Sequence, residues 1–226
     1  MKKLFIFLFI GMLNLCSYGY SQERLVIDYP IIKEYVTNQN EEFQKLMQRF
    51  EMNDSLLTRK DYAMIYYGFS FTPQYIASMF ETSKEFRNVR KLAKEQKNEE
   101  AYEAGKILLE KNPVSLELLY NMGMLAQALN KDINEVKHYS KRYAALLTMI
   151  AFTGDGKTEE TAFKVICVND EYQLLRMLFV MENMKSQSLV NKCDLIEFEK
   201  CKYYLGTQMY FDISRSLDYM SKLFKK

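Results

Sequence analysis

Apolar residues recur every three or four positions from residue 30 to residue 150, a spacing typical of amphipathic helices. Polar residues mark several helix starts, because Thr58, Ser83 and Asp132 can each accept a backbone hydrogen bond there. Glu135, three residues after Asp132, would complete a capping box. Together these features predict one or two helices over 30–52, followed by helices over 58–68, 83–93, 98–111, 115–130 and 132–150.

Beyond residue 152 the pattern changes to short runs rich in β-branched and aromatic residues. We expect strands over 162–168, 195–198 and 208–213, a short helix over 170–179, and a final helix capped by Ser214. In the last strand Met209, Phe211 and Ile213 alternate with polar or tyrosine positions, which predicts that these three side chains are buried. The predicted fold is α+β: N-terminal and central α-helical hairpins, then a small antiparallel sheet and a C-terminal helix.

The first 21 residues have the three-part layout of an export signal, with Lys2 and Lys3 before an uncharged apolar run over 4–13. That run is too short to span a bilayer, which needs about 20 apolar residues. Gly19 and Ser21 favour cleavage before Gln22, and cleavage directly after Gly19 is the alternative.

Cys16 offers a second alternative, a lipoprotein cut just before that cysteine. Leu15 stands where such signals place a small residue, so we expect ordinary cleavage and an exported protein, periplasmic or secreted. We divide the chain into a signal over 1–21, a helical region over 22–152 and an α+β region over 153–226 packed on it.

Loss of the signal changes the charge balance of the chain. The full chain has 31 basic and 29 acidic residues. Cleavage removes Lys2 and Lys3 but no acidic residue, which leaves equal numbers of basic and acidic residues. A neutral mature chain lacks the excess of positive charge that is typical of proteins that bind nucleic acid. We therefore expect no nucleic-acid partner, and the mature sequence predicts no transmembrane segment.

Three cysteines remain after cleavage: Cys167, Cys193 and Cys201. In an oxidising compartment one disulfide is possible, with three possible pairings, and burial as small apolar side chains is the alternative. Their spacing contains no CxxC pair, so the sequence predicts neither a redox motif nor a zinc site.

No set of residues in the sequence predicts catalysis, a cofactor or a metal. The segment Gly154 to Lys157 lacks the longer glycine loop of a phosphate site, so we interpret it as a turn. Acidic residues over 155–171 could serve as calcium ligands, but their spacing matches no EF-hand and acids are common near helix starts. The single histidine, His138, lies within a predicted helix, and we expect it to face solvent.

An aromatic cluster lies within and just after the helix predicted over 58–68. We expect it to pack the helix against its neighbours, and an interaction surface is the alternative. Its members are Tyr62, Tyr66, Tyr67, Phe69, Phe71 and Tyr75.

Residues 101–113 resemble the second helix of a tetratricopeptide repeat, with Ala101, Leu109 and Pro113 at its characteristic positions. Leu119 and Gly123 match the first helix of a following repeat. We interpret residues 82–150 as two degenerate helical hairpins, although generic helix packing would produce the same apolar stripes along these helices.

Several short motifs over the mature chain resemble those of the domain-of-unknown-function 4919 family of exported Bacteroidetes proteins. They include 61–68, the run from Gly154 to Leu175, and Tyr210-Phe211-Asp212. The resemblance implies a cell-envelope or secreted setting in a Gram-negative bacterium. It implies no activity and supplies no catalytic residues.

These observations favour an interaction module whose helical hairpins bind a protein or peptide in the cell envelope. If residues 115–130 form the first helix of a hairpin, its outward face contains Glu117, Tyr120, Met124 and Gln127. A carboxylate-dependent enzyme of envelope or carbohydrate chemistry is the main alternative, and a structural accessory to an envelope assembly is a third hypothesis.

Overall fold

A computed structural model describes residues 24–77 and 83–225 of the chain, and the proposed signal segment and Cys16 lie outside these residues. The helical region contains α2 (Tyr29–Asn38), α3 (Asn40–Glu51), α4 (Arg59–Phe69), α5 (Lys84–Lys94), α6 (Asn98–Lys111), α7 (Leu116–Ala128) and α8 (Ile133–Ala151). The second region contains β1 (Phe163–Lys164), α9 (Val168–Met177), the 3-10 turn η1 (Met181–Asn183), β2 (Met184–Val190), β3 (Cys193–Phe198), β4 (Gln208–Asp212) and α10 (Ser214–Leu223). The α+β prediction is confirmed, and among the described residues we find no helix with the length and apolar character needed to cross a membrane.

Helix caps explain several of the helix starts. The Thr58 side chain accepts from the Asp61 amide while the Asp61 carboxylate accepts from the Thr58 amide, which forms a capping box. Ser83 caps α5 as predicted. Asp132 caps α8, but the capping box predicted there is wrong, because the Glu135 carboxylate accepts instead from the Tyr102 hydroxyl.

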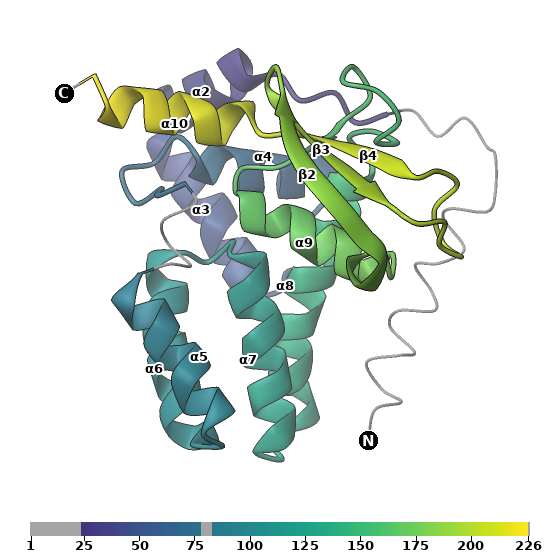
Figure 1. Cartoon of the computed structure of the whole chain (residues 1–226). Coiled ribbons are helices and arrows are strands. Elements are labelled where there is room, and N and C mark those ends of the chain that lie inside the picture. Colours follow the sequence, from purple (N-terminus) through teal and green to yellow (C-terminus); the bar gives the residue numbers. More distant parts are fainter. Residues whose placement is uncertain (1–23, 78–82, 226) are drawn as a thin grey trace.

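Helices α5 and α6 pack as one hairpin and α7 and α8 as a second, as the stripes over 82–150 predict. The two hairpins meet where α6 contacts α7 (Figure 1). At that contact Gly105 lies against Met122, so a side chain at position 105 would collide with the Met122 sulfur. The small residue therefore leaves room for the Met122 side chain between the two helices.

The sheet is mixed, with strand order β1-β4-β3-β2. Strands β2, β3 and β4 are antiparallel, but β1 pairs in parallel with β4, which corrects the prediction of a purely antiparallel sheet. The predicted strand over 162–168 is reduced to two residues. Beyond it the Ile166 amide donates to the Tyr66 hydroxyl, and the Ile166 carbonyl accepts from Tyr75 and Ser216, so side chains take the place of a strand partner.

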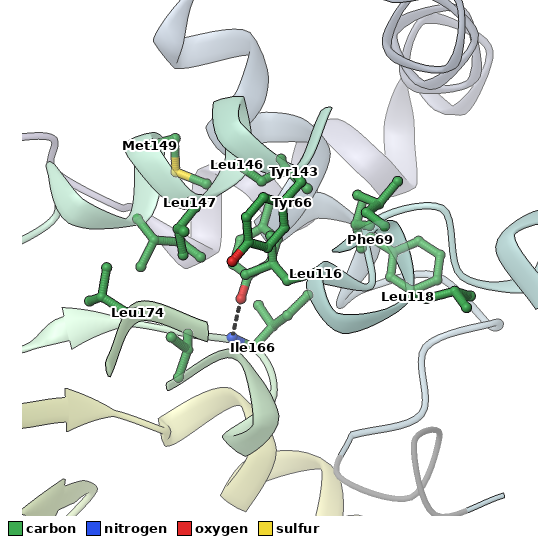
Figure 2. Packing of buried hydrophobic residues seen from close by; sticks show 14 of the residues in the cluster. Tyr66, Phe69, Leu116, Leu118, Tyr143, Leu146, Leu147, Met149, Ile166 and Leu174 are labelled. Carbon is green, nitrogen blue, oxygen red and sulfur yellow. Dashed lines mark hydrogen bonds between the residues drawn. The ribbon is translucent and has the colours of Figure 1, made fainter. Parts of the chain in front are cut away.

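One apolar core runs from the helical region into the sheet. Met209, Phe211 and Ile213 are all buried in it, as their alternation predicts. Figure 2 shows the part of the core where Tyr66 of α4 lies among side chains of α7, α8 and α9, with its hydroxyl bonded to Ile166. Figure 1 shows the sheet packed over α9, and α9 crossing one end of α7 and α8.

Candidate functional site

The four residues predicted to form a contact surface share one face of α7, and we call this set the α7 face: Glu117, Tyr120, Met124 and Gln127. Met124 is 41% exposed, whereas the other three are partly buried. Helix α9 lies against the N-terminal half of this face, and the exposed part extends from Met124 toward the C-terminal end of α7.

Glu117 is held by residues of two other helices. The Arg90 guanidinium of α5 donates to its carboxylate through Nε at 2.9 Å and through Nη2 at 2.5 Å. Asn169 of α9 donates to the second carboxylate oxygen at 3.2 Å. The Glu117 side chain is 16% exposed, and these bonds fix its orientation at the point where α5, α7 and α9 approach one another.

Tyr120 is held by aromatic and cationic contacts. Its ring lies 5.6 Å from the Tyr143 ring of α8, and the Arg176 guanidinium of α9 lies 5.4 Å from its centroid. Sequence reasoning missed Asn169 and Arg176, since only the tertiary fold brings α9 beside α7. The result is a largely preformed surface, with fixed polar groups at one end and a flexible exposed thioether at the other.

A buried pair of carboxyl groups, Glu171 of α9 and Asp194 of β3, lies between α9 and the sheet. Gln187 Nε2 donates to Asp194 at 2.7 Å and more weakly to Glu171 at 3.4 Å, and the Gln187 carbonyl oxygen accepts from Tyr172. Burial raises the pKa of Glu171 well above its usual value, and the charge of Asp194 and a hydrogen bond to it raise that pKa further. Glu171 is completely buried, so these converging carboxyl groups do not form an accessible acid–base pair for a substrate.

The segment from Gly154 to Lys157 forms a closed turn, as predicted. The amides of Asp155 and Gly156 both donate to the Thr161 carbonyl, at 3.0 and 2.8 Å, so these two amides are not available to hold a phosphate. Gly154 is required there because an added Cβ would lie 2.1 Å from the same carbonyl oxygen.

The structure separates the other candidate residues. In the described ranges no group of three or more His, Cys, Asp or Glu side chains could hold a metal ion. The aromatic cluster packs inside the protein, with Tyr66, Tyr67, Phe69 and Tyr75 buried, as the packing interpretation predicts. No disulfide joins Cys167, Cys193 and Cys201, all of which lie in the described part of the chain.

Fold and surface together define a small α+β protein in which two helical hairpins and α9 present one polar and aromatic face. A family model described as a domain of unknown function (DUF4919) matches residues 30–222. The chain therefore belongs to this family, as its motifs predict. No curated protein and no solved structure matches it.

Proposed function

We propose that the protein is an exported interaction module of the bacterial cell envelope that binds an extended or helical peptide segment of a partner at the α7 face. The observation that carries this proposal is the combination of a fixed Glu117 and Tyr120 with an exposed Met124 on one face of one helix. Oriented polar and aromatic groups give specificity, while a flexible methionine adapts to an apolar side chain of the ligand.

The helical hairpins support this proposal. We propose that α5 and α7 correspond to the first helices of two tetratricopeptide repeats, and the Arg90–Glu117 ion pair links these two helices. In such repeats the first helices line the concave binding face. We propose that this chain uses a degenerate form of the same arrangement, in which α9 limits the groove at one end.

The test uses a displayed library of random 12-residue peptides selected on the processed protein. Peptides selected on the wild type should bind Met124→Lys at least about tenfold more weakly, because the substitution puts a charge where the ligand would contact the thioether. Met124 is a better position for this test than Tyr120, since removing the Tyr120 ring would also remove its packing on Tyr143 and Arg176.

The matched control is Ile107→Lys, an exposed apolar position on α6 that is more exposed, at 57%, than Met124. Binding to this variant should stay within about twofold of wild type, because the change leaves the contact surface intact. Equal binding to both variants, or no enrichment of peptides over the bare support, would contradict the proposed function.

Export is the second part of the proposal, and its support is the charged start, short apolar run and small residues of the first 21 positions. N-terminal sequencing of the protein recovered from the envelope or medium of an expressing Gram-negative cell should begin at Gln22 or at Tyr20. An acylated Cys16 at the N-terminus would show a lipoprotein instead, and an intact Met1 in the cytoplasm would refute export.

A further inference from the structure

A second surface feature lies away from the α7 face. It is a pocket of about 170 Å³ where the end of α3 meets α6 and α8. Its lining residues are Glu51, Lys106, Leu109, Glu110, Pro113, His138, Tyr139 and Arg142. Its lining combines apolar and aromatic side chains with one buried cation, which is the composition expected of a binding site for a small charged group.

Arg142 is that cation, and the residue is only 4% exposed. Its Nε donates to the His138 carbonyl at 3.2 Å, and its guanidinium lies 5.7 Å from the Phe50 ring centroid and 5.6 Å from that of Tyr139. Within the described ranges no carboxylate lies close enough to Arg142 to form an ion pair, although the charge of Glu51, which lines the same pocket, favours the cationic form of its guanidinium. A buried charge that no carboxylate contacts directly is costly, so the chain maintains here a cation that a ligand could neutralise.

His138 is not solvent-facing as predicted but half-buried beside Arg142. Asn53 adopts a left-handed backbone conformation after α3. Its side-chain nitrogen Nδ2 lies 2.9 Å from His138 Nδ1 and 3.1 Å from the His138 carbonyl oxygen. Since the side-chain amide of Asn53 donates this hydrogen bond, the Nδ1 atom of His138 accepts it and the proton of the His138 ring is on Nε2. Burial and the nearby Arg142 charge lower the pKa of His138, which favours the neutral ring at physiological pH.

The other charged residues around the pocket favour a singly charged anion over a multiply charged one. Lys106 is already paired with Glu103 at 2.7 Å, and the pocket is bordered by the exposed carboxylates of Glu51 and Glu110. These two acids repel a multiply charged anion such as phosphate more strongly than a singly charged one. The planar guanidinium fork matches a carboxylate, which can accept two parallel hydrogen bonds.

We infer that this pocket binds a carboxylate group, with the Arg142 guanidinium as its recognition element. The same chemistry is present in a small organic acid and in the C-terminus of a peptide. The inference does not depend on the α7 face, because none of the four residues of that face lines the pocket.

The experiment is isothermal titration of the processed protein at pH 7 with N-acetylglycine, tetraalanine, the C-terminal amide of tetraalanine and inorganic phosphate. We expect a free carboxylate to bind, the amide not to bind, and phosphate to bind more weakly than the carboxylate. Binding of N-acetylglycine identifies a small acid as sufficient, whereas binding of tetraalanine alone identifies a peptide C-terminus. No saturable binding of either carboxylate, equal binding of the amide, or tighter binding of phosphate would overturn the inference.

Two further variants test the role of Arg142. Arg142→Lys keeps the charge but loses the planar fork, so carboxylate affinity should fall at least about tenfold, with folding checked by circular dichroism. The double variant Glu51→Gln with Glu110→Gln changes only exposed residues and should raise carboxylate affinity a few-fold, which keeps the test decisive if Arg142→Lys does not fold.

Met124→Lys should leave this carboxylate affinity unchanged, so that failure of this inference and failure of the proposed function give different results. Unchanged affinity in both Arg142→Lys and the double variant would overturn the inference.

Discussion

Replacing Phe211 with alanine should lower the free energy of unfolding by about 3–5 kcal/mol, the usual cost of deleting a buried aromatic ring. Phe211 is completely buried in β4, between Phe163 of β1 and Asp194 of β3, and its ring lies 5.8 Å from that of Phe163. Its removal would leave a cavity where the sheet meets the helical region. Urea unfolding followed by circular dichroism measures the change.

Gln208→Ala, three positions earlier on β4, is the matched control. Gln208 is exposed and donates one hydrogen bond to Glu197, so we expect a change of less than about 0.5 kcal/mol. A similar small effect at both positions would contradict the buried face assigned to β4.

Replacing Glu171 with glutamine should stabilise the protein at alkaline pH, by about 1 kcal/mol or more, and should change little at pH 5. The pKa of Glu171 is raised in the folded state, so its stabilising contribution is fully present below its unfolded pKa, near 4.3, and is lost as the pH rises through the raised folded pKa. Glutamine has the same shape, stays neutral at every pH and can donate to Asp194. Thermal unfolding at a series of pH values should therefore show a flatter alkaline profile for the variant.

Glu197→Gln on β3 provides the comparison. Hydrogen bonds from Ser186 and Gln208 lower the pKa of Glu197, so it is already ionised in this pH range and its substitution should leave the alkaline slope unchanged. If Glu171→Gln kept the wild-type slope, Glu171 would not hold a proton in the folded protein.

Helix positions were predictable because the chain carries both an apolar repeat and local caps. Thr58 with Asp61 and Ser83 act within one helical turn, so the sequence contains the complete signal for those helix starts. The alternation of Met209, Phe211 and Ile213 is equally local, and it predicted the buried face of β4 correctly.

Strand β2 was missed because it is a polar edge strand. Its sequence, from Met184 to Val190, contains Lys185 and two serines and leaves every side chain at least partly exposed, so it has no apolar alternation. Its pairing with β3 also includes a bulge near Met184. Ser214 was expected to cap α10, but it is the first helical residue, and the Asp212 carboxylate accepts from its amide instead.

The candidate sites were predictable only in part, because they depend on contacts between distant segments. The spacing of Glu117, Tyr120 and Met124 places them on one helix face, but nothing local indicates that Asn169 and Arg176 lie beside them. Likewise His138 was expected to face solvent, since the position of Asn53, 85 residues earlier in the chain, follows only from the packing of α3 near α8.

The most direct test of the proposed function is amide hydrogen exchange of the processed protein, with and without a saturating selected peptide. Peptide binding at the α7 face should slow exchange over residues 116–128, where the ligand covers the helix, and at the neighbouring side of α5 over 84–94. Slowed exchange confined to other segments, with 116–128 unchanged, would contradict the claim that α7 carries the binding surface.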